Sequence, residues 1–550
     1  MSNSGNLAKC DMVLAVSENS INKQFNKLWQ EDTIKKDWKL LVREIKGQSP
    51  VIKIETDSDF DSALTGWQNA QKDLSSLFSE GKFQEFGEKT GDYTKNGALY
   101  NYGWSGSIKA PSIIILEKSH QSVLFTIGFS SGTLYYASDT TKEMSIFDLT
   151  NVIYAFDVPI GRITIDNDGK HLAPQTHKQI QQTIAEYSLS ASDFSIESLF
   201  MDFENAKISN FDKMNSKFPE EASSPLQILI EDYFNLVVSK EDNPYILGYA
   251  LSVKGSDSDK SVFQPSALRF STSASDKEGY SAFNYLTMVH GDNFPAGADV
   301  GIMPHNLLDN TISDIDTVDG VAFIDRNILR DYFKEKIISQ IKENCSKPNV
   351  RVHLSGIFDQ NIHYNWGLTS FQNPTIVEND SGPEVLNFSY SSEASDEAGL
   401  GGDMGKMKLK CDFNASVQFK ADTIVITQHL VLYLYIRSLQ TSNSGNIIDK
   451  TITDTYTLNT KDGKLEYDIV SKVLDNSKSP SSGGFLNFFT DIDDLTKDVK
   501  NWASKFIKTN LRDIPLSTSK KYFFPADRVF SYHDAKFSDK QNLITTITYK

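Results

Sequence analysis

The segment MKLKCDFNASVQF, residues 407–419, alternates apolar and polar side chains along its whole length. Apolar or small residues occupy every odd position and polar residues every even position. This period of two is typical of a β-strand with one buried and one exposed face. A polar turn at 420–423 follows, and residues 424–436 predict a return strand rich in Val, Ile, Leu and Tyr. At roughly 3.3 Å per residue each arm is about 40 Å long, which predicts an extended, strongly bent antiparallel sheet and not a small barrel.

The composition is that of a globular protein with a β-rich interior. The chain has 550 residues, of which 39% are hydrophobic and 23% charged, and it contains 34 Phe and 22 Tyr. Aromatic residues favour strands, and this length predicts about two to four domains. The formal net charge is −17, whereas a nucleic-acid-binding surface is dominated by Lys and Arg. The charge therefore excludes nucleic acid as the expected partner.

The cysteines and the start of the chain bear on where the protein is made. The 3 cysteines, at positions 10, 345 and 411, are too few for a disulfide framework and predict folding in a reducing compartment. Residues 1–9 contain no apolar signal core, and no run approaches the roughly eighteen apolar residues of a membrane-spanning helix. We expect a soluble protein, made in the cytoplasm without a signal peptide and without a transmembrane segment.

A short strand followed by a capped helix occurs twice in the sequence. Residues 12–16 precede Ser17, and residues 321–324 precede Asp325, and both residue types are favoured N-caps. Apolar residues then follow at +4, +8 and +12 from each cap: Ile21, Phe25 and Trp29 in the first helix, and Leu329, Phe333 and Ile337 in the second.

The two halves also close in the same way, since amphipathic helices are predicted at 223–240 and 491–509. The pattern therefore predicts in each half a strand, a helix, a long β-meander and a closing helix, as an internal duplication would give. The predicted lobes are residues 1–244 and residues 245–550, with 245–318 and 515–550 contributing to a bridging sheet.

Two stretches show no clear pattern of a regular helix or strand. Residues 81–107 are expected to form a polar loop or an irregular hairpin. Residues 378–405 are rich in Ser, Gly, Glu and Asp and are expected to be an exposed insertion.

The motifs of common enzymes are missing from the sequence. It contains no HExxH, GxSxG, Walker or CxxC motif, and its 9 histidines are scattered with no pair at ligand spacing. The glycine-rich segment 399–405 leads into a strand, whereas a phosphate loop needs the start of a helix. We therefore expect no catalytic residues, no metal and no cofactor. A pair of carboxylates distant in sequence, as glycosidases use, stays open.

Several segments resemble one bacterial family. They are DMVLAVS at 11–17 with INKQF at 21–25, YILGY at 245–249, FNYL at 283–286, the helix at 323–338, the hairpin at 409–436, and FSD with ITY at 537–549. In these segments the chain resembles the clostridial P47 proteins and their OrfX relatives, which belong to the tubular lipid-binding (TULIP) superfamily.

The resemblance implies an α+β fold of mostly antiparallel strands. It implies two tandem TULIP-like lobes, each a long helix wrapped by a highly curved antiparallel sheet, with an apolar groove between helix and sheet. It also implies a non-enzymatic protein that binds a lipid or other hydrophobic ligand, a phosphoinositide included. The implied partners are a toxin or other P47- or OrfX-type proteins, and release from the cell would then occur together with the toxin.

The apolar faces of the predicted helices either fill a core or line the groove for an acyl chain. The groove candidates are Ile21, Phe25, Leu28, Leu329, Phe333, Val499, Trp502 and Phe506. Candidates for a lipid headgroup are Arg326, Arg330 and Lys334, which are spaced by four residues and share one helix face. The alternative for these cations is an ordinary solvated helix surface.

A second function fits the long hairpin. A membrane-active or pore-forming insecticidal component could insert the hairpin around residues 420–423, since the even-numbered side chains of 407–419 are polar, as a pore lumen requires. Against this, the return strand has apolar residues on both faces, such as Leu432 and Tyr433, and is expected to be buried on both sides. An enzyme of unrecognised type is the remaining alternative.

Overall fold

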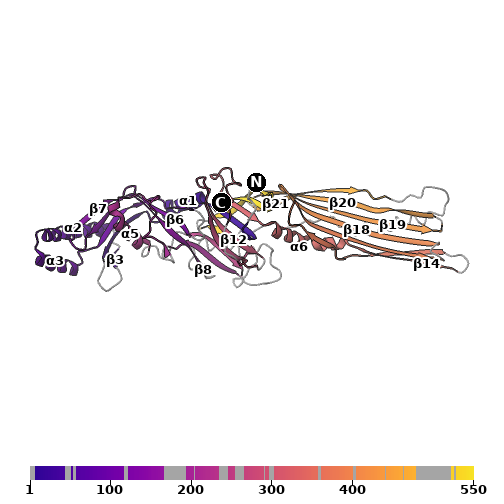
Figure 1. The fold of residues 1–550 in the computed structure, drawn as a ribbon, viewed down its shortest axis with the longest axis horizontal. Helices are drawn as coiled ribbons and strands as arrows, with labels where there is room; N and C mark the ends of the chain where they lie inside the picture. The colour runs from indigo at the N-terminus through magenta and orange to yellow at the C-terminus, as the bar shows by residue number, and fades with distance from the viewer. Residues whose placement is uncertain are drawn as a thin grey trace.

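The protein is elongated, with helices at one end, a large sheet through the middle and a fan of long strands at the other end (Figure 1). The computed structural model describes residues 7–43, 51–53, 57–116, 122–165, 194–202, 205–234, 246–253, 265–289, 292–296, 303–356, 361–399, 404–439, 441–461, 464–478, 522–524 and 528–549.

The large sheet contains 16 of the described strands, which pair antiparallel. Its main path runs β11-β12-β1-β13-β24-β23-β22-β10-β9-β8-β6-β4-β2-β3, and β5 and β7 both pair with β6. The strands are β1 (Met12–Ser17), β2 (Asp37–Arg43), β3 (Val51–Lys53), β4 (Tyr102–Ile108), β5 (Ser112–Ile114), β6 (Ser122–Ala137), β7 (Met144–Asp148), β8 (Ile153–Ile165), β9 (Phe194–Met201), β10 (Ile246–Val253), β11 (Pro265–Ser273), β12 (Ala282–Val289), β13 (Gly320–Ile324), β22 (Tyr522–Phe524), β23 (Arg528–Phe537) and β24 (Leu543–Tyr549).

Segments from both ends of the chain meet in the middle of this sheet. β1 lies between β12 and β13, and β13 pairs with β24. β10 pairs with β9 on one side and with β22 on the other. The strands after residue 245 therefore continue the sheet of the N-terminal strands, while the lobe boundary at 244/245 stays a prediction.

The two predicted strand–helix units lie side by side at this centre. The helices are α1 (Glu18–Gln30) and α6 (Arg326–Asn344), and their N-caps are the expected ones. The Ser17 hydroxyl accepts a hydrogen bond from the N–H of Ser20 at 3.0 Å, and the Asp325 carboxylate accepts one from the N–H of Asn327 at 2.8 Å. β1 and β13 pair antiparallel, so α1 and α6 leave the centre toward opposite ends of the molecule (Figure 1).

The other helices of the described residues lie in the N-terminal half. They are α2 (Asp57–Ser79), α3 (Phe83–Lys95), α5 (Ser223–Asp232) and the short 3₁₀ helix η2 (Glu220–Ala222). The helix predicted at 223–240 begins at the predicted residue, and its last residues, 235–240, lie outside the described residues, as does the whole predicted helix at 491–509.

The prediction of a polar loop or irregular hairpin at 81–107 is wrong, because α3 and β4 occupy most of it. α3 carries no buried residue, and its apolar face consists of a few aromatic rings that are easily overlooked among polar residues. It is held on α2 instead, by Phe83 and Phe86 at 5.5 Å from the ring of Phe78 and by an ion pair between Lys89 and Asp73 at 2.7 Å.

The fan of long strands is a separate six-stranded antiparallel sheet, which we call the distal sheet (Figure 1). In it the predicted strand at 407–419 is confirmed as the core of β18. The strands are β16 (Thr375–Glu378), β17 (Glu384–Ala398), β18 (Gly405–Lys420), β19 (Thr423–Ser438), β20 (Thr441–Lys461) and β21 (Lys464–Asp475), in that order across the sheet.

Two predictions about this region are wrong. Much of the expected insertion at 378–405 is β17, which pairs with β18 from Glu384 to Ala398. Its composition is polar because one of its faces is exposed, while Phe388 and other residues on the opposite face are buried. The return strand β19 is fully buried on one face only, and Val431 and Tyr433 on its other face are half-buried.

The predicted fold class is confirmed. The protein is α+β with mostly antiparallel strands, and α1 and α6 each pack against an antiparallel sheet. Of these helices, α6 is the longer, with 19 residues against 13 in α1.

Candidate hydrophobic-ligand site

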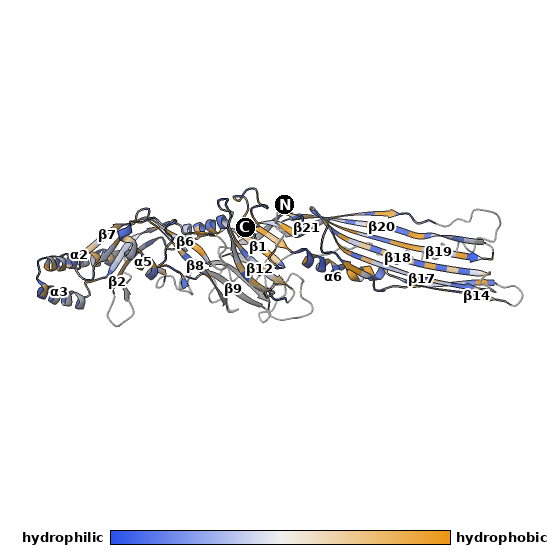
Figure 2. Ribbon diagram, viewed as in Figure 1, coloured by the Kyte–Doolittle hydropathy of each residue, from blue (hydrophilic) through white to orange (hydrophobic). Residues whose placement is uncertain are grey.

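The distal sheet has one apolar face and one polar face, which we call its inner and outer faces. The hydropathy bands along its strands alternate accordingly (Figure 2). On β18 every odd residue from Met407 to Phe419 is at most 5% exposed, and its cross-strand partners on β19 include the buried Ile424, Leu432 and Leu434. The inner face is therefore apolar along the whole of β18, while Gln428 on β19 and Asp454 on β20 are buried polar residues within it.

The outer face carries ion pairs between neighbouring strands. Lys406 binds Glu397 at 3.1 Å, and Lys408 binds Glu393 at 2.6 Å. These side chains are about a third to a half exposed, so each pair contributes little to stability, roughly 0–1 kcal/mol. They keep the outer face hydrated, which fixes which face of the sheet turns inward.

Helix α6 covers the half of the inner face that is nearer the centre of the molecule. Leu329, Phe333 and Ile337 are at most 1% exposed and pack with the β18 residues from Phe413 to Phe419. The rings of Phe333 and Phe419 lie 5.8 Å apart.

A two-stranded hairpin covers the other half of the inner face. It consists of β14 (Lys347–Ser355) and β15 (Asn361–Thr369), which pair only with each other among the described strands, and we call it the hairpin cover. Val350, Val352 and Trp366 pack with the β18 residues from Met407 to Cys411. The hairpin cover was not predicted from the sequence, although apolar residues alternate on both of its strands.

The two covers meet at the end of α6, and a small cavity lies where they meet. It has a volume of about 20 Å³, room for roughly one water molecule. Its apolar walls come from the sheet and the hairpin cover, and its polar rim comes from the end of α6. The lining residues are Glu343, Asn344, Ser346, Leu368, Cys411, Leu430, Leu432 and Ile448.

The cavity has one polar atom that its described surroundings do not satisfy. The side-chain amide of Asn344 donates to Gln428 at 3.3 Å, while its Oδ1 is buried without a hydrogen-bond partner among the described residues. Such an orphaned acceptor costs stability unless a water or a ligand group reaches it.

Two hydrogen bonds tie the hairpin cover to the distal sheet. The N–H of Val352 donates to the carboxylate of Asp396 at 2.8 Å, and the phenol of Tyr364 donates to the carbonyl oxygen of Arg437 at 2.6 Å. Burial raises the pKa of Tyr364, so the phenol stays a donor at neutral pH. Apolar packing of Val350, Val352 and Trp366 on the sheet also holds the cover in place.

The apolar inner face reaches an open edge at β21. Ile469 and Val473 lie on this face, because they pair with the buried Tyr456 and Ile452, yet they are 37% and 55% exposed. Exposed apolar residues that continue a buried face are typical of a ligand or partner site.

The three cysteines are buried and unpaired. Burial raises the pKa of Cys345 to about 12 and that of Cys411 to about 11. Both thiols therefore stay protonated at neutral pH, and Cys411 packs as a small buried hydrophobe.

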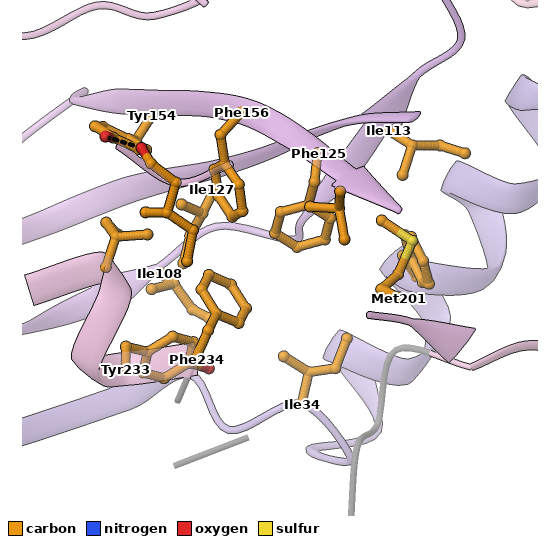
Figure 3. Close-up of a cluster of buried hydrophobic side chains, with 14 of the residues drawn as sticks. Ile34, Ile108, Ile113, Phe125, Ile127, Tyr154, Phe156, Met201, Tyr233 and Phe234 are labelled. Carbon is orange, nitrogen blue, oxygen red and sulfur yellow. Dashed lines mark hydrogen bonds between the residues drawn. The ribbon is translucent and has the colours of Figure 1, made fainter. Parts of the chain in front are cut away.

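Most of the predicted groove residues are buried in the two hydrophobic cores. Ile21, Phe25 and Leu28 belong to the same hydrophobic cluster as Phe125, Tyr154, Phe156 and Phe234, which we call the N-terminal core. Figure 3 shows the aromatic part of this core. Leu329 and Phe333 lie under the distal sheet. Val499, Trp502 and Phe506 lie outside the described residues. The groove role of all eight stays a prediction.

The predicted headgroup cations all have partners within the protein. Arg326 donates to Gln541 at 2.9 Å and to the carbonyl oxygen of Asn379 at 2.7 Å. Arg330 is bound by Asp331, Glu378 and Asp380 at 3.1, 3.1 and 3.6 Å, and Lys334 shares Glu378 at 2.6 Å. A lipid headgroup at this helix face would have to displace carboxylates that already neutralise it.

Comparisons with known proteins give a likeness in structure only. No family model and no curated protein matches the chain. The structure is similar to the crystal structure of P47 of Clostridium botulinum E1, over 98% of this chain and 99% of that one, at 11% identity and a TM-score of 0.46. It is also similar to a lipopolysaccharide binding protein, over 98% and 99% of the two chains, at 9% identity and a TM-score of 0.22. At these values neither likeness assigns the chain to a family.

Within the described ranges, no group of three or more His, Cys, Asp or Glu side chains is placed to hold a metal ion. The same part of the chain contains no helix that is long and apolar enough to cross a membrane.

Proposed function

We propose that the protein is non-enzymatic and binds a lipid or other hydrophobic molecule on the inner face of the distal sheet. The observation that carries this proposal is a long, largely apolar face whose cover consists of two separate pieces, α6 and the hairpin cover. The cavity at their junction and the exposed apolar residues of β21 mark where the cover is incomplete.

The energetics favour an acyl chain as the ligand. Burying about sixteen methylenes at roughly 0.8 kcal/mol each gives about 13 kcal/mol before the cost of ordering the chain. A ligand between the hairpin cover and the sheet would replace the apolar contacts between them with apolar contacts to itself. The net free-energy cost of lifting the cover is therefore small. The polar rim of the cavity, with the free acceptor of Asn344, suits the hydroxyl or amide end of a lipid.

Native mass spectrometry of freshly purified protein, followed by organic extraction, tests the proposal. We expect a stoichiometric lipid on the wild type and its loss in Leu430→Trp, because Leu430 lines the cavity and tryptophan would fill it. Val431→Trp is the matched control, since Val431 is the next residue and lies on the outer face. A wild-type protein that is empty and also takes up nothing from liposomes would overturn the proposal.

We further propose, on the sequence resemblance alone, that the protein acts beside a bacterial toxin as P47- and OrfX-type proteins do, and that it is released with that toxin. Co-purification with the toxin, or with another protein of this type from the same cells, is the expected result. A protein that elutes alone from such lysates under mild conditions would contradict it.

The membrane-inserting alternative is disfavoured by the tip of the long hairpin. The N–H of Phe537 donates to the carbonyl oxygen of Ala421, and the N–H of Leu458 donates to that of Asp422 at 2.8 Å. The rings of Phe419 and Phe537 are stacked at 4.7 Å. Leu458 belongs to the distal sheet itself, whereas Phe537 belongs to β23 of the large sheet. Insertion of the tip would have to break both contacts with Phe537, so we expect no liposome leakage.

A further inference from the structure

Two histidines face each other across the hairpin cover. His353 on β14 and His363 on β15 are directly opposite in the antiparallel register. Their rings are 5.0 Å apart and inclined by only 22°, and both side chains are exposed. They are separated by ten residues in the sequence, so only the hairpin turn brings them together, and the sequence showed no pair at ligand spacing.

A hydroxyl group lies beside this pair. The Oγ atom of Ser355 is 2.5 Å from Nε2 of His363, and this hydrogen bond orients one of the two rings. The adjacent cross-strand pairs are Ser355 with Asn361 and Arg351 with Asn365, which share the exposed face with the histidines. The groups gathered here that could ligate a cation are therefore two imidazoles, a hydroxyl and amide oxygens. The guanidinium of Arg351, also on this face, carries a positive charge that would repel a cation.

We propose that His353 and His363 form a binding site for a divalent transition-metal ion, namely Cu²⁺, Ni²⁺ or Zn²⁺. Imidazole nitrogen is a favoured ligand of these ions, whereas Ca²⁺ and Mg²⁺ require oxygen ligands and usually carboxylates. Zn²⁺ binds imidazole nitrogen at about 2.0–2.1 Å, so a bridging ion needs the two rings to turn toward a common point. Because both side chains are exposed, this rotation meets little packing resistance.

The remaining coordination positions are open to solvent. Among the described residues no further His, Cys, Asp or Glu completes a three-residue group here, so water completes the coordination. Ser355 holds Nε2 of His363, which leaves Nδ1 of this ring for the ion. An ion bound in this way joins β14 to β15 near the turn. A two-stranded hairpin is only marginally stable by itself, and a metal bridge across it stabilises the hairpin cover.

Isothermal titration of tag-free protein with ZnCl₂ and with CuCl₂ tests the site. We expect saturable binding of one ion per chain, with Cu²⁺ bound more tightly than Zn²⁺. His353→Gln and His363→Gln should each weaken binding on the order of tenfold or more, because loss of a ligand costs at least as much as loss of an outer hydrogen bond. Exposed Gln is compatible with a strand, so circular dichroism should show all variants folded.

Two other histidines provide the matched controls. His429 is held by Asp449 at 2.9 Å and His533 by Thr548 at 2.8 Å, and His429→Gln and His533→Gln should leave the affinity unchanged. Binding that persists undiminished in the double variant His353→Gln/His363→Gln would place the ion elsewhere and overturn the proposal. The absence of saturable binding to the wild type would overturn it as well.

Hydrogen exchange of the segment 347–369 gives an independent measurement. Zn²⁺ should slow exchange in this segment of the wild type and leave it unchanged in the double variant. If Zn²⁺ binds to the wild type without slowing exchange there, the ion does not bridge the two strands and the proposed geometry is wrong.

Discussion

The N-terminal core and the distal sheet both bury large apolar faces, but they close them in different ways. In the N-terminal core aromatic rings interlock, and Phe125, Phe156 and Phe234 lie 5.6–5.8 Å from one another (Figure 3). Tyr154 joins this cluster and donates its hydroxyl to the carbonyl oxygen of Ile208 at 2.7 Å. In the distal sheet the inner face is largely aliphatic and its cover is in two pieces.

This difference bears on where a ligand can enter. Edge-to-face ring contacts depend on specific angles, so a guest among them would disrupt several pairs at once. Aliphatic contacts are non-directional, so those beneath the hairpin cover can be replaced by contacts with an acyl chain. This difference supports the proposed placement of the ligand at the distal sheet, with the N-terminal core as the rigid part.

The largest expected effect comes from Phe156→Ala in the N-terminal core. Phe156 is fully buried and contacts two other phenylalanines and Tyr154, so the free energy of unfolding should fall by about 3–5 kcal/mol. Urea denaturation followed by tryptophan fluorescence measures it. The folded fraction should keep the lipid content of the wild type. Loss of lipid in this variant would place the ligand in the N-terminal core and contradict its placement at the distal sheet.

A smaller effect is expected where the two regions meet, at Asp11. Burial, together with the charges of Asp292 and Asp325, raises the pKa of Asp11 to about 6, against an opposing hydrogen bond from the N–H of Val289. The folded state thus holds the proton more tightly than the unfolded state. The contribution of Asp11 to stability is complete below its ordinary pKa of 3.8 and is lost as the pH rises toward 6.

Asp11→Asn removes this titration and keeps an acceptor for Val289. The stability of the variant relative to the wild type should rise by roughly 1–2 kcal/mol between pH 4 and pH 7.5, after allowance for solvent screening. Urea denaturation at several pH values measures the difference. A constant difference across this range would show that Asp11 titrates normally.

The sequence predicted those elements whose pattern is set locally. The alternation at 407–419 predicted β18 correctly, because one face of this strand is buried and the other is in contact with solvent along its whole length. The caps Ser17 and Asp325 marked the starts of α1 and α6 because cap chemistry involves only neighbouring residues. By contrast, β17 is a strand because β18 offers it hydrogen bonds, and its own composition gives no such signal.

The candidate site could be predicted only in part. An apolar stripe indicates that Leu329 and Phe333 are buried, but it does not say what buries them. The hairpin cover, the junction cavity and the facing histidines depend on which strands pair, a property of the whole fold. The partners of the cations Arg326, Arg330 and Lys334 could not be read from the helix face. Arg326 donates to Gln541 and to the carbonyl oxygen of Asn379, and Arg330 and Lys334 share Glu378, all far from α6 in the sequence.

The smallest expected effect tests the attachment of the hairpin cover. Tyr364→Phe removes the hydrogen bond to the carbonyl oxygen of Arg437 and keeps the ring, so local opening of the cover should become easier by roughly 0.5–1 kcal/mol, while global stability hardly changes. Hydrogen exchange in 347–369 should quicken a few-fold, and a bound lipid should exchange faster with liposomes. Tyr435→Phe is the control, because Tyr435 pairs with Lys408 on the outer face of the same sheet. If Tyr364→Phe quickens exchange in 347–369 but leaves lipid exchange unchanged, the ligand does not enter beneath the hairpin cover, and the open edge at β21 becomes the entrance to test.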